Sequence, residues 1–315
     1  MHTVAVDILT SFLGSGKTTL LRHVLDHDLR GKPVAVIMNE IGEIGIDGRV
    51  ITGLSAVETM VELSSGCICC TIDDYRFDLA VQEIVETTRP HLIIIESTGL
   101  ADPEPLAYRV KGAGLGLDAI ITVVDVHDGP RQLRETEVAG RQVEAADFLV
   151  LNKLDLVDER TADRVERQLA RRNPRAERFR TVRGAIESDV LFATGVAAFR
   201  ERARRPAGDH LHADGFTSFV YRSERPLEQK SFERLLGRLP GDVVRAKGIV
   251  RLAGRDWQCL FNVTCGRYEL SWVKLPEVAE NQAVFIGRNL GRHESALRGA
   301  LAACETADER SSSHA

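Results

Sequence analysis

Several hallmarks of membrane, nucleic-acid-binding and exported proteins are missing from this sequence of 315 residues. Its longest apolar runs are Leu92–Ile95, Ala119–Val124 and Phe148–Leu151, all far below the ~20 residues of a membrane-spanning helix. A formal net charge of −5 leaves no basic surplus, so we expect no nucleic-acid partner. The first apolar stretch has no basic segment before it and runs into a glycine-rich loop, which predicts a strand of the fold and no signal peptide.

What the sequence does contain is typical of a folded globular protein. Hydrophobic residues make up 43% and charged residues 28% of the chain. At ~150 residues per domain, this length predicts about two domains. The six cysteines include three within four residues, too close for unstrained disulfides, which favours reduced thiols and a cytoplasmic protein.

The first part of the chain alternates apolar runs with helical patterns. Predicted strands cover residues 4–9, 34–38, 91–95, 119–124 and 148–151, and predicted helices cover 17–26, 77–88 and 159–172. Strands alternating with helices predict an α/β fold with a doubly wound, mostly parallel sheet. We assign residues 1–199 to this domain.

A second, smaller α+β domain is predicted after a charged segment that ends in proline and glycine. The linker is placed at 200–214, the second domain at 215–305 and a frayed tail at 306–315. Its predicted strands are 216–221, 243–252, 258–263, 268–272 and 284–287, and its predicted helices are 227–239 and 294–304.

A phosphate-binding loop is predicted between the first strand and the first helix. Gly14, Ser15 and Gly16 allow the backbone to approach phosphate oxygens, and the helix N-terminus attracts an anion. Lys17 would neutralise the β- and γ-phosphates, while the hydroxyl of Thr18, which Thr19 follows, would bind Mg²⁺. Ser11 stands where such loops usually begin with glycine, so either phosphate binding is weaker or this position tolerates a Cβ atom.

Two further segments at strand ends fit a nucleotide site. Glu96 follows an apolar strand, where it would face the Mg²⁺ ion, and the N–H of Gly99 would contact the γ-phosphate. In Asn152-Lys153-Leu154-Asp155, the Asp155 carboxylate would accept two hydrogen bonds from guanine, a donor pair that adenine lacks. Asn152 would fix the loop and reach the base, and the Lys153 stem would cover the base, so GTP is favoured over ATP.

The segment Gly66-Cys67-Ile68-Cys69-Cys70 predicts a transition-metal site. Three thiolates favour zinc, and they leave one tetrahedral position for a water or another ligand. Buried small thiols or a redox pair are the alternatives. His210 and His212 are candidate accessory ligands, and core packing is the better interpretation of Cys259, Cys265 and Cys304.

In this order, the motifs resemble the CobW-like GTPase family of metal chaperones. The resemblance extends through Asn39-Glu40-Ile41-Gly42-Glu43 and Glu96-Ser97-Thr98-Gly99 to Gly215–Pro226 in the second half. It implies a GTPase that uses GTP, GDP and Mg²⁺, binds Zn²⁺ or else Co²⁺, Fe²⁺ or Ni²⁺ at Cys67, Cys69 and Cys70, and delivers the metal to a client metalloenzyme. It also implies that Glu40 and Glu43 lie in a first switch, and Glu96 and Gly99 in a second. Met38 stands where some members have glutamate, which removes one candidate metal ligand.

Two other functions stay open from the residues alone. A small-molecule kinase could use the same phosphate loop, and a zinc buffer with a degenerate nucleotide site could use the same thiols. The client and the oligomeric state, for which a homodimer is one option, are not determined by the sequence. We expect GTP and metal to favour the same arrangement of the switches, so that each raises the affinity for the other by the same factor.

Overall fold

The chain divides into two compact units, each described here by itself. The computed structural model describes residues 4–12, 14–27, 29, 33–38, 57–62, 74–97, 99, 101–186, 188–192, 216–273 and 280–306. One unit is Thr3–Gly195 and the other is Val196–Ala315 with Met1–His2. The predicted linker at 200–214 lies outside the described residues, so its bounds stay a prediction.

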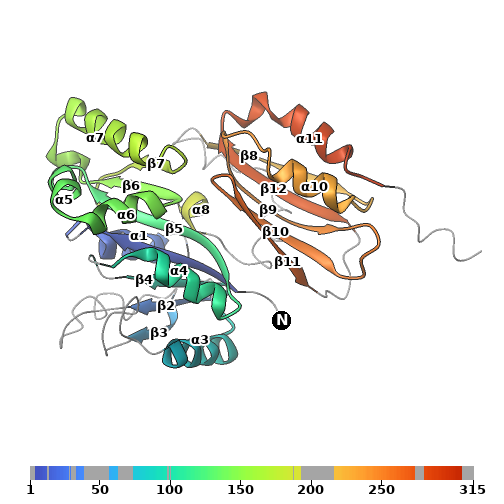
Figure 1. Cartoon of the computed structure of the whole chain (residues 1–315), viewed down its shortest axis with the longest axis horizontal. Helices are drawn as coiled ribbons and strands as arrows, with labels where there is room; N and C mark the ends of the chain where they lie inside the picture. Colours follow the sequence, from blue (N-terminus) through green and yellow to red (C-terminus); the bar gives the residue numbers. More distant parts are fainter. Residues whose placement is uncertain are drawn as a thin grey trace, which may run out of the picture. The chain divides into compact units, whose positions relative to one another are not determined.

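A parallel sheet of seven strands forms the centre of the first unit (Figure 1). Its strand order is β3-β2-β4-β1-β5-β6-β7, and each neighbouring pair is parallel. The strands are β1 (Ala5–Ser11), β2 (Val34–Met38), β3 (Val57–Glu62), β4 (Leu92–Glu96), β5 (Gly116–Asp125), β6 (Phe148–Asn152) and β7 (Glu177–Arg180). All five residues of β4 are buried, which means that both faces of the sheet are covered, as the doubly wound prediction requires.

Helices follow the strands and bury one apolar side each. They are α1 (Lys17–His27), α3 (Asp74–Thr88), α4 (Pro103–Gly112), α5 (Gly129–Glu135), α6 (Glu137–Ala145), α7 (Glu159–Arg172) and α8 (Ser188–Leu191), with a 3₁₀ turn, η1, at Leu154–Leu156. In α7, Ala162, Val165 and Leu169 are buried at helical spacing, and the Asp158 side chain caps the first turn by accepting a hydrogen bond from the Thr161 N–H.

The strand order places the polar strand ends at one edge of this sheet. Strand β1 lies between β4 and β5, and the order reverses there, so the crossovers diverge at β1. The carboxyl ends of β1, β4, β5 and β6 are Ser11, Glu96, Asp125 and Asn152. Ligands of open α/β sheets bind at such a reversal, outside the carboxyl ends of the strands.

The second unit contains an antiparallel sheet of five strands in the order β11-β10-β9-β12-β8. The strands are β8 (Phe216–Ser223), β9 (Val243–Arg251), β10 (Gln258–Thr264), β11 (Arg267–Val273) and β12 (Asn281–Arg288). The helices are α10 (Gln229–Leu236) and α11 (Glu294–Ala302), with a 3₁₀ turn, η3, at Leu290–Arg292. Phe232 of α10 packs edge-on against Phe261 of β10, inside a core that also holds Leu297 and Leu301 of α11.

The structure corrects the predicted role of one cysteine. Cys259 and Cys304 are buried in the core of the second unit, as predicted, and burial raises the pKa of both thiols, that of Cys259 to about 12. Cys265 is only half-buried and lies in the two-residue turn between β10 and β11 with φ of 46°. The prediction of core packing at Cys265 is wrong because this turn, and no strand, occupies positions 265 and 266.

Candidate nucleotide and metal site

The phosphate loop has the backbone that its glycines predict. Gly14 and Gly16 have φ of 72° and 95°, and a Cβ atom at Gly16 would lie 2.5 Å from Nδ2 of Asn152. The Ser15 hydroxyl donates to the carbonyl oxygen of Phe12 at 2.8 Å, which tightens the turn. Helix α1 begins at Lys17, directly after this turn, so its N-terminal N–H groups lie next to the loop.

Ser11, the departure at the first loop position, is accommodated by the fold. It is the last residue of β1, where it is buried and pairs with Val123 of β5. It is not among the residues with positive φ. An extended backbone accepts a Cβ atom, so of the two readings of Ser11 the structure favours the one in which this position tolerates its side chain.

Lys17 and Glu96 form an ion pair at the carboxyl edge of the sheet. The distance from Nζ of Lys17 to Oε1 of Glu96 is 2.6 Å, and the two side chains are 14% and 5% exposed. The second carboxylate oxygen of Glu96, Oε2, is buried and has no hydrogen-bond partner among the described residues. A half-buried cation and a buried anion with an unused oxygen lie beside the loop that the sequence assigns to phosphate.

The side-chain oxygens of Glu96 and Thr18 suit a magnesium ion. Mg²⁺ prefers carboxylate and hydroxyl oxygens together with water and substrate phosphates. The unpartnered Oε2 of Glu96 provides such an oxygen, and Thr18, half-buried in the first turn of α1, carries a hydroxyl near the same edge. Thr19, the next residue, is exposed.

Asn152 ties the phosphate loop to the loop that follows β7. Its Nδ2 donates to the Ser15 carbonyl oxygen at 2.8 Å, and its Oδ1 accepts from the Gly184 N–H at 3.1 Å. Asn152 is 1% exposed, and both ends of its amide are occupied by these loops. Gly184 has φ of 69° and lies so close to α1 that a Cβ atom would be 2.7 Å from Cα of Leu20. The structure therefore places Asn152 as a brace between two loops.

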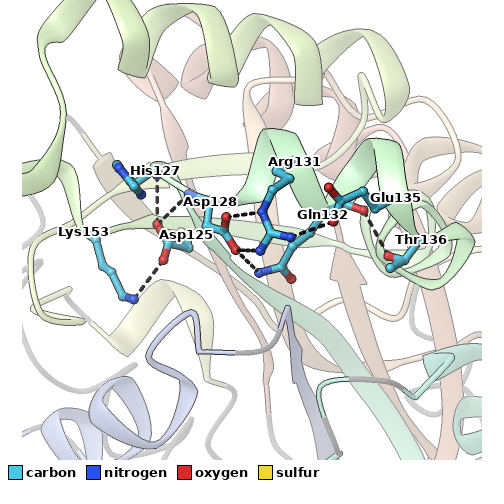
Figure 2. Close-up of polar contacts among 8 residues, drawn as sticks. All are labelled: Asp125, His127, Asp128, Arg131, Gln132, Glu135, Thr136 and Lys153. Carbon is cyan, nitrogen blue, oxygen red and sulfur yellow. Dashed lines mark hydrogen bonds and ion pairs between the residues drawn. The ribbon is translucent and has the colours of Figure 1, made fainter.

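The base end of the candidate site is formed by Lys153 and Asp155. Lys153 has φ of 64°, and its Nζ forms an ion pair with Oδ2 of Asp125 at 2.8 Å (Figure 2). Asp155 lies in η1, where its side chain is exposed, and no hydrogen bond or ion pair joins it to the described part of the chain. A free carboxylate beside a fixed lysine stem has the acceptors that guanine needs.

Asp125, which was not among the predicted site residues, organises the turn after β5. Its Oδ1 accepts hydrogen bonds from the N–H groups of His127 and Asp128, at 2.8 and 3.2 Å. Asp128 in turn bonds Arg131 and Gln132, as Figure 2 shows, and mainly the hydrogen bond from Arg131 lowers the pKa of Asp128 to about 2. An acid at the end of an apolar strand was the available signal, the same one that identified Glu96.

The remaining predicted residues are only partly described. Gly99 lies in the loop after β4 and is half-buried. Glu40, Glu43, Cys67, Cys69, Cys70, His210 and His212 fall outside the described residues. Within the described part of the chain, no group of three or more His, Cys, Asp or Glu side chains could hold a metal ion. Nor does any helix of that part combine the length and hydropathy needed to cross a membrane.

In the sequence, the thiol segment falls between β3 and α3, and β3 ends at a described edge of the parallel sheet. Met38 at the end of β2 pairs with Glu96 on one side and with Glu62, the last residue of β3, on the other. At ~4.8 Å between neighbouring strands, Glu62 and Glu96 lie about 10 Å apart along the same edge. Strand β3, the last described element before Cys67 in the sequence, therefore ends at the edge that carries the Lys17–Glu96 pair.

Comparisons with known proteins match both units. The model of the CobW/HypB/UreG nucleotide-binding domain matches residues 5–180, and that of the cobalamin synthesis protein CobW C-terminal domain matches residues 216–305. The zinc chaperone YjiA of Escherichia coli K12 is 32% identical over 96% of this chain and 99% of the relative. Zinc-regulated GTPase metalloprotein activator 1 of Dictyostelium discoideum is 29% identical over 86% of this chain and 66% of the relative. The solved structure of Zn(II)-bound YjiA GTPase from E. coli is 26% identical, with a TM-score of 0.44 over 97% of this chain and 100% of that one.

Proposed function

Since the chain belongs to the CobW/HypB/UreG family, which confirms the resemblance predicted from its motifs, we propose that it is a GTP-hydrolysing metallochaperone. It binds Zn²⁺ as cargo at Cys67, Cys69 and Cys70 and transfers it to a client metalloenzyme under control of the bound nucleotide. Relatives whose names record a zinc chaperone and a zinc-regulated GTPase support both halves of the proposal. Cytoplasmic localisation and a homodimer belong to the same proposal.

The observation that carries the proposal is the Lys17–Glu96 ion pair at the end of the phosphate loop. In this arrangement Lys17 meets the β- and γ-phosphates of GTP and offsets their negative charge. Thr18 and Glu96 would hold Mg²⁺, which would supply positive charge at the phosphates. The oxygen atom Oε2 of Glu96, without a partner among the described residues, suits that role.

The base end selects guanine. Asp155 accepts hydrogen bonds from the N1–H and the 2-amino group of the base, and the Lys153 stem, held by Asp125, lies over its ring. Asn152 keeps this end in register with the phosphate loop through Ser15. Gly99, in the loop after Glu96, donates its N–H to the γ-phosphate. Glu40 of the first switch is the further catalytic residue of this proposal.

The proposal is tested by measuring phosphate release from GTP, with and without zinc, in the wild-type chain and in Lys17→Ala. We expect turnover in the wild type and a loss of about 10²–10³-fold in the variant, because a charge that stabilises the transition state is removed. Lys230→Ala, an exposed lysine of α10, is the matched control and keeps full turnover. Zinc binding without GTP turnover in the wild type would point to a zinc buffer, and a phosphorylated acceptor would point to a kinase.

A further inference from the structure

Gln142 of α6 is a completely buried glutamine whose side chain reaches the loop after β4. It is 0% exposed. Its Nε2 donates to the carbonyl oxygen of Ala101 at 2.9 Å and lies 3.3 Å from that of Gly99. The backbone of Gln142 is fixed in turn, because the Thr122 hydroxyl of β5 donates to its carbonyl oxygen at 2.8 Å. A rigid strand and helix thus hold an amide against the loop that contains Gly99.

Among the residues that the structure describes, the Gln142 amide is only half satisfied. Two carbonyl oxygens face it, so its nitrogen must point towards them and its oxygen must point away. That oxygen, Oε1, is buried and has no hydrogen-bond partner within the described residues. An unpaired buried acceptor costs about 1–3 kcal/mol, and a leucine at this position would avoid that cost. The described contacts of this amide are therefore those of its nitrogen, which donates to the loop.

The loop that Gln142 contacts is fixed at its two ends by other groups. At the start, the Ser97 N–H donates to the Leu9 carbonyl oxygen at 2.9 Å. At the end, Asp102 caps α4 by accepting from the Glu104 N–H and forms a 3.2 Å ion pair with Arg141. Between these ends, Gln142 is the side chain of the described residues that bonds the backbone at Gly99 and Ala101. Among the described residues, one amide therefore holds the carbonyl oxygens of Gly99 and Ala101.

We propose that Gln142 is a positioning residue for GTP hydrolysis, acting through the backbone of Gly99. This inference rests on the proposed function, which places the Gly99 N–H at the γ-phosphate. Gln142 itself touches no phosphate: it fixes the carbonyl groups on the far side of Gly99 so that the N–H keeps its direction. Because GDP has no γ-phosphate, Gln142 affects the binding and hydrolysis of GTP and leaves the binding of GDP unchanged.

The test is Gln142→Leu, which keeps the size of the side chain and removes both donors. We expect kcat for GTP and the affinity for a non-hydrolysable GTP analogue to fall about 10- to 100-fold, while the Kd for GDP stays within about twofold. Gln82→Leu is the matched control, because Gln82 on α3 donates to Glu86 one turn away and we expect no change in either nucleotide. Equal losses for GDP and the GTP analogue, or an unchanged kcat, would overturn the proposal and leave Gln142 a structural residue.

A second measurement needs no variant to fold. The wild-type chain is labelled with ¹⁵N at its glutamine side chains, and the amide spectra are compared with GDP and with the GTP analogue bound. The Gln142 amide signal shifts between the two nucleotides and the Gln82 signal does not; identical Gln142 signals would overturn the inference. Absence of any GTP turnover in the wild type would instead overturn the proposed function.

Discussion

The two units use polar side chains for different purposes. In the parallel sheet they gather at the carboxyl edge, where Glu96 keeps one oxygen without a partner and Asp155 stands free in the described part of the chain. In the antiparallel sheet, Glu305 accepts hydrogen bonds from the hydroxyls of Tyr221 and Ser223, both at 2.6 Å, and so fastens the end of the described chain to β8. An unused carboxylate oxygen beside the phosphate loop indicates a ligand site, whereas the two hydroxyl hydrogen bonds to Oε1 of Glu305 indicate a structural lock.

The largest effect that sharpens this comparison is expected at Gly16 in the first unit. In Gly16→Ala the methyl group meets Asn152 at a backbone with φ of 95°, so we expect the free energy of unfolding to fall by about 3 kcal/mol and GTP binding to be lost. Gly14→Ala is the matched control: its φ is 72°, yet nothing lies within 4 Å of the added Cβ, and we expect a loss of about 1 kcal/mol. Denaturant unfolding of both variants measures the difference, and equal losses would contradict the bracing role of Asn152.

A smaller effect is expected at Asp155, on function alone. Asp155→Asn removes an acceptor for the guanine donors, so the affinity for GTP should fall about 10- to 100-fold while the melting temperature is unchanged, because the side chain is exposed. Inosine triphosphate, which lacks the 2-amino group, checks the assignment. The wild type should bind inosine triphosphate more weakly than GTP, and this difference in affinity should be smaller in Asp155→Asn. An unchanged difference would mean that Asp155 does not contact the base.

The smallest effect is expected at Glu305, on stability alone. Burial acts to raise the pKa of this carboxyl, but the hydrogen bonds from Ser223 and Tyr221 outweigh it and hold the pKa below the ordinary glutamate value of 4.5. A lowered pKa in the folded state means that the charged form stabilises the fold above pH 4.5 and that this contribution is lost as the pH falls below it. Glu305→Gln should therefore have a lower melting temperature than the wild type at pH 7, and this difference should disappear at low pH.

The rate of GTP hydrolysis distinguishes the structural role of Glu305 from a role at the nucleotide site. Glu305→Gln should hydrolyse GTP at the wild-type rate, since Glu305 bonds only groups of its own unit in the described structure. A gap in melting temperature that persists at low pH would contradict the charge argument. A loss of turnover would break the division of roles between the two units.

The family and the class of fold could be predicted from the sequence because each motif and the apolar pattern of each strand are local features, and their order can be read along the chain. The apolar run 34–38 and the helix 159–172 appear with the predicted bounds. Strand β3 was missed because Val-Glu-Thr-Met-Val-Glu carries too few apolar residues to stand out, and pairing with β2 makes it a strand. Helices α4, α5 and α6 were also missed; each is short, at 10, 7 and 9 residues.

The candidate site was predictable only in part, for a related reason. Lys17, Glu96 and Asp155 stand in motifs, so residue type and spacing identify them. Asp125 follows an apolar strand, which was an available signal, but its contact with Lys153 lies 28 positions away. Gln142 contacts Ala101, 41 positions away, and nothing in its immediate neighbours signals that contact. Positioning residues of this kind are visible only once the strands and helices are placed.

We propose that nucleotide binding and metal binding are energetically linked through the segments that join the two sites. A zinc competition titration tests this linkage most directly. A chelator of known affinity competes for zinc with the wild-type chain bound to GDP and bound to a non-hydrolysable GTP analogue. We predict that the two zinc affinities differ about 5- to 150-fold and that zinc changes the ratio of the nucleotide affinities by the same factor. Equal zinc affinities with both nucleotides would contradict the account.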